Sequence, residues 1–143
     1  MMKLETLPTL TERYFANAAG AVEYVPGAYV YLRWTGVPMS STEVHALYVH
    51  AHNLLARHKL KRILADHRSM PPLAEADKEW LLTKWLPETV RQTGYSRCAV
   101  LKTMEPANQL HTDSVVKTLE RFVSVKVFDD LPAAAEWLAG NDQ

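Results

Sequence analysis

The sequence predicts an α/β domain with a mixed, mostly parallel sheet of about five strands, an N-terminal antiparallel hairpin and about four covering helices. Two observations support this fold class. Segments in which side chains alternate between two faces are concentrated before residue 35, as expected for antiparallel strands. After residue 40, helical patterns and short apolar runs alternate along the chain, which is typical of β-α units with a parallel sheet.

The first strands are predicted from period-two alternation. The segment 28–34 alternates between one face with Tyr29, Tyr31 and Arg33 and another with Ala28, Val30, Leu32 and Trp34. Pro26-Gly27 is a turn dipeptide, so 21–25 is expected to pair with this strand as a hairpin. The segment 12–18 is expected to add an edge strand.

The middle of the chain predicts helix, strand, helix and strand. Ser40 or Ser41 is a candidate N-cap for a helix that ends near His58, with an apolar stripe of Val44, Leu47, Tyr48, Ala51 and Leu55. The apolar run 63–65 is expected to be a buried strand. A helix from about Ala74 is expected to be interrupted by Pro87 and to resume over 88–93 before Gly94. The run 98–101 is the next strand.

The C-terminal part predicts helix, strand and helix. A helix over 106–122 is expected to bury Leu110, Val115, Leu119 and Phe122, and a final strand covers 123–128. Asp129-Asp130 is expected to cap a last helix that begins with Pro132 and docks through Ala135, Trp137 and Leu138.

Composition places the chain among ordinary globular proteins. At 143 residues it is expected to form one domain, with an ordered core of about 12–139 and a terminal segment up to Leu10. Sixteen basic residues balance sixteen acidic ones, so no strong field is available to attract nucleic acid. Cys98 is the single cysteine, which excludes an internal disulfide and fits a reducing compartment. The N-terminus has no continuous apolar run, and no stretch approaches the roughly 18 apolar residues of a membrane span, so a cytoplasmic location is expected.

The ordered set of motifs resembles the STAS/SpoIIAA-like family of small bacterial proteins. The matching segments are AYVYLRWTG, ILADHRSM, DKEWLLTKWLPETVRQTGY, CAVL and VFDDLPAAAEWL, which together cover about 12–139. Such proteins are similar in fold to anti-sigma-factor antagonists and to lipid-carrier domains of the CRAL-TRIO type. The resemblance implies a binding or regulatory module rather than an enzyme.

One departure from that pattern concerns phosphorylation. In phospho-switched antagonists a serine or threonine directly follows the loop aspartate, and a glycine comes shortly after. Here His67 follows Asp66, no glycine follows in the loop, and the nearest hydroxyl is that of Ser69. A phosphorylation switch at this loop is therefore not expected.

Asp66, His67, Arg68 and Ser69 form a polar cluster at the expected end of a strand, where α/β proteins commonly place their sites. In one interpretation Arg68 grips a carboxylate or phosphate, and His67 titrates near neutral pH. In the other, Asp66 caps the next element, and Arg68 pairs with it or with a helix terminus.

No motif predicts a metal, a cofactor or a catalytic group. The histidines His45, His50, His52 and His58 contain no pair at i,i+3 or i,i+4 spacing, and HExxH and CxxC patterns are absent. Neither a G-x-S-x-G elbow nor a Gly-rich phosphate loop occurs, and Cys98 is expected to be a buried, inert thiol. Acidic residues at 75, 77 and 79 suit the positive end of a helix.

Trp80 and Trp85 are the remaining candidates for a site. Five residues span about 140° around an α-helix, so the two side chains are expected on different faces, with one meeting a partner or lining a pocket. We therefore expect a non-enzymatic module that binds a protein partner or itself through loop 66–73 and this helix, and that loses binding more than stability when Trp85 is truncated. The alternative is a small carrier with an apolar pocket, open at Arg68 or His67, for an amphipathic anionic ligand.

Overall fold

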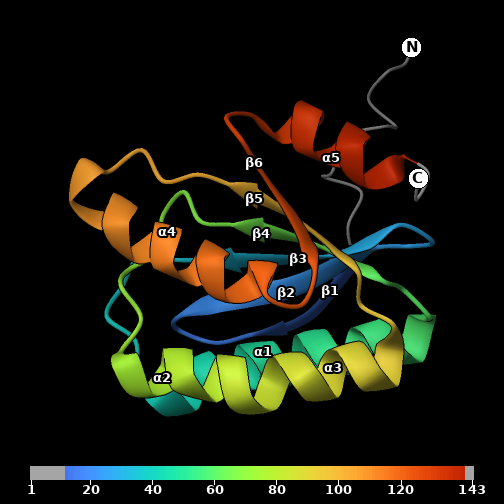
Figure 1. Ribbon diagram of the computed structural model, residues 1–143, viewed down its shortest axis with the longest axis horizontal. Coiled ribbons are helices and arrows are strands. Elements are labelled where there is room, and N and C mark those ends of the chain that lie inside the picture. Colours follow the sequence, from blue (N-terminus) through green and yellow to red (C-terminus); the bar gives the residue numbers. More distant parts are fainter. Residues whose placement is uncertain (1–11, 141–143) are drawn as a thin grey trace.

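The computed structural model describes residues 12–140, which form one six-stranded sheet in the order β1-β2-β3-β4-β5-β6 (Figure 1). The expected terminal segment up to Leu10 lies outside these residues. The strands are β1 Glu12–Ala16, β2 Gly20–Val25, β3 Tyr29–Trp34, β4 Arg62–Asp66, β5 Arg97–Leu101 and β6 Ser124–Phe128. Strands β1 to β3 pair antiparallel, and β3 to β6 pair parallel. The predicted fold class is confirmed, with β1 as the additional edge strand.

The two faces of the sheet are covered unequally. The helical segments are α1 Ser41–His58, α2 Glu75–Trp80, η3 Leu81–Trp85, α3 Leu86–Thr93, α4 Pro106–Glu120 and α5 Leu131–Ala139. All except α5 bury side chains in one large core on the same face of the sheet, whereas α5 packs alone on the other face (Figure 1). No helix within 12–140 combines the length and the hydropathy needed to cross a bilayer.

The predicted alternation in β3 is confirmed. Tyr29 and Tyr31 pack on the α5 side, whereas Val30, Leu32 and Trp34 belong to the larger core. Because β4 and β5 are covered on both faces, their central residues are buried without alternation, as is usual for strands inside a parallel sheet.

Helix α4 differs from the expectation. Val115 and Leu119 are buried as predicted, but Leu110 is 81% exposed and Phe122 is 38% exposed. The buried stripe of α4 consists of Thr112, Val115 and Leu119. Leu110 lies about 140° around the helix from Val115, and Phe122 follows the helix end, so neither can reach the core.

Pro87 does not break its helix. The segments α2, η3 and α3 follow one another without interruption from Glu75 to Thr93, and Gly94 ends the helix in the left-handed conformation expected of a C-terminal glycine. The amide of Leu86 donates to the carbonyl of Leu81, five residues back, which makes Leu81–Trp85 a single π-turn. A proline in a regular α-helix clashes with the carbonyl four residues earlier, here that of Thr83. The π-turn just before Pro87 loosens the helix at this position.

The N-terminus of α1 provides a stability test that separates the two candidate caps. Ser40 is the N-cap: its Oγ accepts from the amide of Glu43 at 3.2 Å, and the Glu43 carboxylate accepts from the amide of Ser40. We expect Ser40→Ala to lower the free energy of unfolding by about 1 kcal/mol, measured by urea denaturation. Ser41→Ala is the matched control and should change it by less than about 0.5 kcal/mol. Equal losses from both substitutions would contradict this assignment.

Candidate functional site

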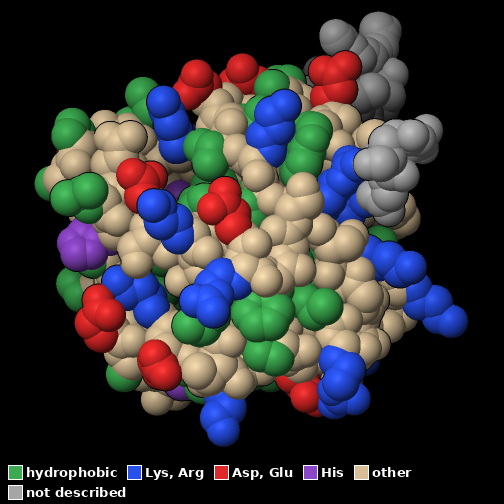
Figure 2. All heavy atoms as spheres, viewed as in Figure 1, with side chains coloured by type: hydrophobic (Ala, Val, Ile, Leu, Met, Phe, Trp, Pro, Cys, Tyr) green, Lys and Arg blue, Asp and Glu red, His purple; other side chains and the backbone are tan. Residues whose placement is uncertain are grey.

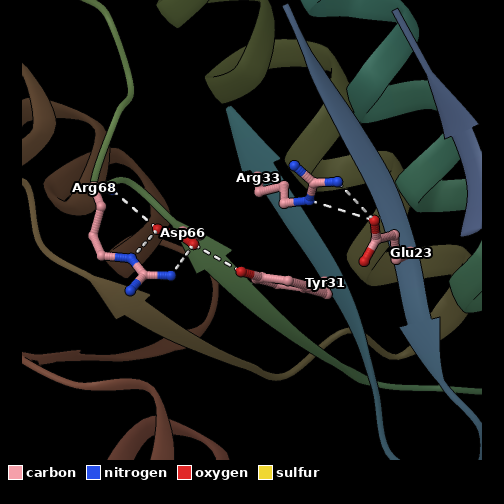
Figure 3. Close-up of polar contacts among 5 residues, drawn as sticks. All are labelled: Glu23, Tyr31, Arg33, Asp66 and Arg68. Carbon is pink, nitrogen blue, oxygen red and sulfur yellow. Dashed lines mark hydrogen bonds and ion pairs between the residues drawn. The ribbon is translucent and has the colours of Figure 1, made fainter. Parts of the chain in front are cut away.

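The loop after β4 is organised around Asp66. Its carboxylate accepts from the Tyr31 hydroxyl at 2.8 Å, from Nε and Nη2 of Arg68 at 2.9 and 2.7 Å, and from the Arg68 amide at 3.1 Å (Figure 3). On β3, Arg33 is the register partner of Asp66, and its guanidinium pairs with Glu23 of β2 at 3.0 Å. Glu23, Arg33, Asp66 and Arg68 thus form a charged quartet with as many acids as bases.

Arg68 is engaged within the chain. Burial raises the pKa of Asp66, but hydrogen bonds from Arg68 and Tyr31 outweigh this effect and hold the pKa below its ordinary value. The hydrogen bond to Asp66 raises the pKa of Arg68, so both groups stay charged. The interpretation in which Arg68 pairs with Asp66 is confirmed. The guanidinium of Arg68 thus makes its bidentate contact with the carboxylate of Asp66 rather than with an external anion.

The pKa of His67 does not lie near neutral pH, which contradicts the interpretation in which this histidine titrates there. Its side chain is 1% exposed, and burial lowers its pKa to about 4, although the neighbouring Asp66 acts in the opposite direction. Its Nδ1 is buried without a hydrogen-bond partner within 12–140. Ser69, by contrast, is exposed at the surface of the loop.

Trp80 and Trp85 lie on the same side of their helix, contrary to the expectation. Both rings contact Tyr48 of α1, with centroids 6.3 and 5.1 Å away, and Nε1 of Trp85 donates to the Tyr48 carbonyl at 2.6 Å. The spacing of 140° assumed a regular α-helix, whereas the π-turn adds one residue between the two side chains. Trp85 is 5% exposed and belongs to the core, and Trp80 is half-buried.

The two tryptophans line an apolar groove between α1 and the helix α2-η3-α3. The groove encloses about 250 Å³. Its other lining residues are Val49, His52, Lys84, Glu88 and Thr89. Val49 is 44% exposed at its surface. We call this feature the Trp80 groove.

Two histidines of α1 flank this groove. His45 stacks on Trp80 with ring centroids 3.8 Å apart, and its Nε2 lies 3.0 Å from the buried carboxylate of Asp77. His52 contacts Thr89 Oγ1 at 2.7 Å and the side-chain oxygen of Gln92 at 3.0 Å. His45, Val49 and His52 are spaced at i, i+4 and i+7 in the sequence, which places their side chains on one face of α1. This spacing could have indicated the face of α1 that borders the groove. Within 12–140 no group of three or more potential metal ligands is present.

The structure separates the two sets of predicted site residues. Asp66 bonds to Tyr31 on the α5 side of the sheet, whereas Trp80 and Trp85 pack with the larger core on the opposite face. Neither Arg68 nor His67 lines the Trp80 groove. The expected pocket with Arg68 or His67 at its opening is therefore not the one found beside the tryptophans.

Two other groups bear on catalysis. Cys98 is buried on β5, and burial raises the pKa of its thiol to about 12, as expected for an inert cysteine. Lys78 Nζ lies 3.2 Å from the Ser114 hydroxyl but also pairs with the Glu75 carboxylate at 2.8 Å. The amine of Lys78 is therefore engaged by two partners within the chain, Glu75 and Ser114.

Comparison with family models, with curated protein sequences and with solved structures finds no match to this chain.

The buried His67 should make stability depend on pH. Its pKa rises from about 4 in the folded chain to the ordinary 6.5 on unfolding, so its contribution is complete above about pH 6.5 and is lost as pH falls towards 4. When the pH falls from about 7 to about 4, the free energy of unfolding of the wild-type chain should decrease because His67 is protonated on unfolding. We expect this decrease to be about 3 kcal/mol smaller in His67→Gln. His111→Gln, at an exposed histidine, is the control and should follow the wild-type curve. Parallel curves for all three proteins in urea titrations would refute the assignment.

The different burial of the two tryptophans predicts different stability losses. Trp85→Ala should lower the free energy of unfolding by about 3–5 kcal/mol, because it leaves a cavity beside Tyr48. Trp80→Ala should cost on the order of 1 kcal/mol, because Trp80 is only partly buried and stacks on His45. Denaturation followed by circular dichroism measures both. A loss for Trp80→Ala as large as that for Trp85→Ala would show that Trp80 belongs to the core.

Proposed function

We propose that the chain is a non-enzymatic, STAS/SpoIIAA-like binding module that holds a protein partner, either another protein or a second copy of itself, at the Trp80 groove. The observation that carries this proposal is the apolar groove in which the half-buried Trp80 lies beside an exposed valine, Val49. Tryptophan is over-represented among the residues that dominate binding energy at protein interfaces. The mixed α/β fold, with its antiparallel strands followed by parallel ones, is compatible with the family resemblance.

The size of the groove favours a protein partner over a carried small molecule. Pockets that enclose drug-sized ligands typically measure about 300–1,000 Å³. The Trp80 groove, at about 250 Å³, falls below this range. It suits one or two apolar side chains that project from a partner surface, while His52 and Glu88 supply polar groups of the lining.

Several contacts support a binding role rather than catalysis. The bases and acids of the loop after β4 neutralise one another, the thiol of Cys98 is buried, and Lys78 is held by Glu75. Groups that are paired in this way stabilise the fold and have no open position for a reacting atom.

Photo-crosslinking tests the proposal. A benzophenone amino acid replaces Val49, and the same amino acid replaces Glu136, an exposed residue of α5 on the other face of the sheet, as the matched control. In cells that naturally contain the chain, irradiation should give a protein adduct from position 49 and not from position 136. Trp80→Ala should remove the adduct while leaving the chain folded.

The alternative function, a small carrier, gives a different result. Native mass spectrometry of the purified chain would then show a mass excess that disappears on denaturation. Such an excess, together with no protein adduct at position 49, would overturn the proposed function and favour an amphipathic ligand. A protein adduct with a mass of twice the chain would identify the partner as a second copy.

A further inference from the structure

A second cleft lies on the other flank of the same helix. It encloses about 500 Å³ between Leu82 of η3 and the part of α4 that runs from Leu110 to Arg121. We call it the α4 cleft. Helix α4 contacts η3, and the α4 cleft shares no lining residue with the Trp80 groove (Figure 1). Its chemistry is therefore independent of the proposed function.

One end of the α4 cleft is apolar. Leu110 is 81% exposed, and Leu82 is half-buried on the facing helix. A single exposed leucine is common on protein surfaces and needs no explanation alone. Here, however, the exposed leucine lies in a concave site whose remaining wall is polar and charged.

The other end of the cleft is basic. Lys117 and Arg121 are exposed, lie at i,i+4 spacing on the same face of α4, and make no ion pair with any residue of 12–140. Like charges at this spacing repel each other by a few tenths of a kcal/mol. The helix dipole favours cations near its C-terminal end, which accounts for the position of this pair but not for the exposed leucine about three turns away.

Hydroxyl groups connect the two ends. Ser114 Oγ accepts from Lys78 at 3.2 Å, and Thr118 Oγ1 donates to the Ser114 carbonyl at 3.1 Å, which leaves hydroxyl oxygens at the floor of the cleft. Asp113 is the one acidic side chain in the lining. Figure 2 shows basic side chains next to hydrophobic and acidic ones over this part of the surface.

We propose that the α4 cleft binds an acidic amphipathic segment of a partner protein. An apolar side chain of that segment contacts Leu110 and Leu82, and its carboxylates pair with Lys117 and Arg121. From Leu110 to Arg121 the α4 helix rises about 16 Å, which equals three turns of a bound helix. A small amphiphile would stay largely solvated in an open cleft, whereas small-molecule sites usually bury about 70–90% of the ligand surface.

The test uses a display library of random 16-residue peptides, selected on the wild-type chain and counter-selected on the variant Leu110→Ser/Arg121→Glu. The selected peptides should be acidic, with at least one large apolar residue. By fluorescence anisotropy, Leu110→Ser and Lys117→Glu should each weaken binding of the best peptide about tenfold or more. Added salt should weaken it further, because exposed charge pairs are screened.

Two variants provide the controls. Lys126→Glu makes the same charge change on the α5 side of the sheet, where Lys126 is the register partner of Ala99, and should alter the affinity less than about twofold. Trp80→Ala should leave the affinity unchanged, so failure of the Trp80 groove and failure of the α4 cleft are distinguishable.

Three results would overturn the proposal. The first is a selection that yields no binder or no acidic bias. The second is peptide binding that Leu110→Ser and Lys117→Glu leave intact. The third is a different occupant of the cleft. Decanoate binding that depends on Leu110 and Lys117 in the same way would assign the cleft to a small amphiphile. Self-association of the chain that Leu110→Ser abolishes would assign it to a second copy. Circular dichroism confirms that each variant folds.

Discussion

The hydrogen bond from the amide of Leu86 to the carbonyl of Leu81 changes the register of the helix that forms both grooves. Through this π-turn, a chain with proline at position 87 stays helical from Glu75 to Thr93. The same extra residue brings Trp80 and Trp85 to one side, where Trp85 is tied to α1 by its bond to the Tyr48 carbonyl. Leu82 then points away from Trp80, towards α4. The positions of Trp80, Trp85 and Leu82 therefore follow from a local adjustment of the helix just before Pro87.

The α5 side of the sheet meets a different constraint. One short helix covers β4 to β6, and the carboxyl ends of β3 and β4 carry the charged quartet instead of apolar side chains. Buried charges are costly unless each has a partner with good geometry, and Asp66 has four donors. Because the quartet has equal numbers of acids and bases, its residues satisfy one another and leave no excess charge for a ligand. This explains why the usual position of an α/β site carries structural interactions in this chain.

The sequence predicted the features that depend on periodicity and missed those that depend on tertiary context. Alternation in β3, the apolar runs of β4 and β5 and the helix end at Gly94 were predicted, because each reflects a local backbone preference. The N-cap of α1 was narrowed to Ser40 or Ser41, and the structure shows that it is Ser40. The continuation of the helix through Pro87 was not predicted, because the rule that proline ends a helix applies to regular α-helices and does not anticipate a π-turn. Leu110 was expected in the core on hydrophobicity alone, although its angle places it outside the buried stripe. The sequence left two interpretations open for the loop that contains His67, because the burial of a single polar residue in a loop cannot be inferred from the sequence.

The two grooves on opposite flanks of α2-η3-α3 differ in the forces available to a partner. The Trp80 groove has an almost wholly apolar surface, so binding there draws on burial of hydrophobic area and changes little with salt. The α4 cleft combines Leu110 with Lys117 and Arg121, which make no ion pair within 12–140, so the binding that we propose there would weaken as salt rises. A partner with one apolar and one acidic segment would engage both, and the second contact would form at the high effective concentration set by the first. Two sites on opposite flanks of α2-η3-α3, completed by α1 and α4, would then add their affinities for one partner.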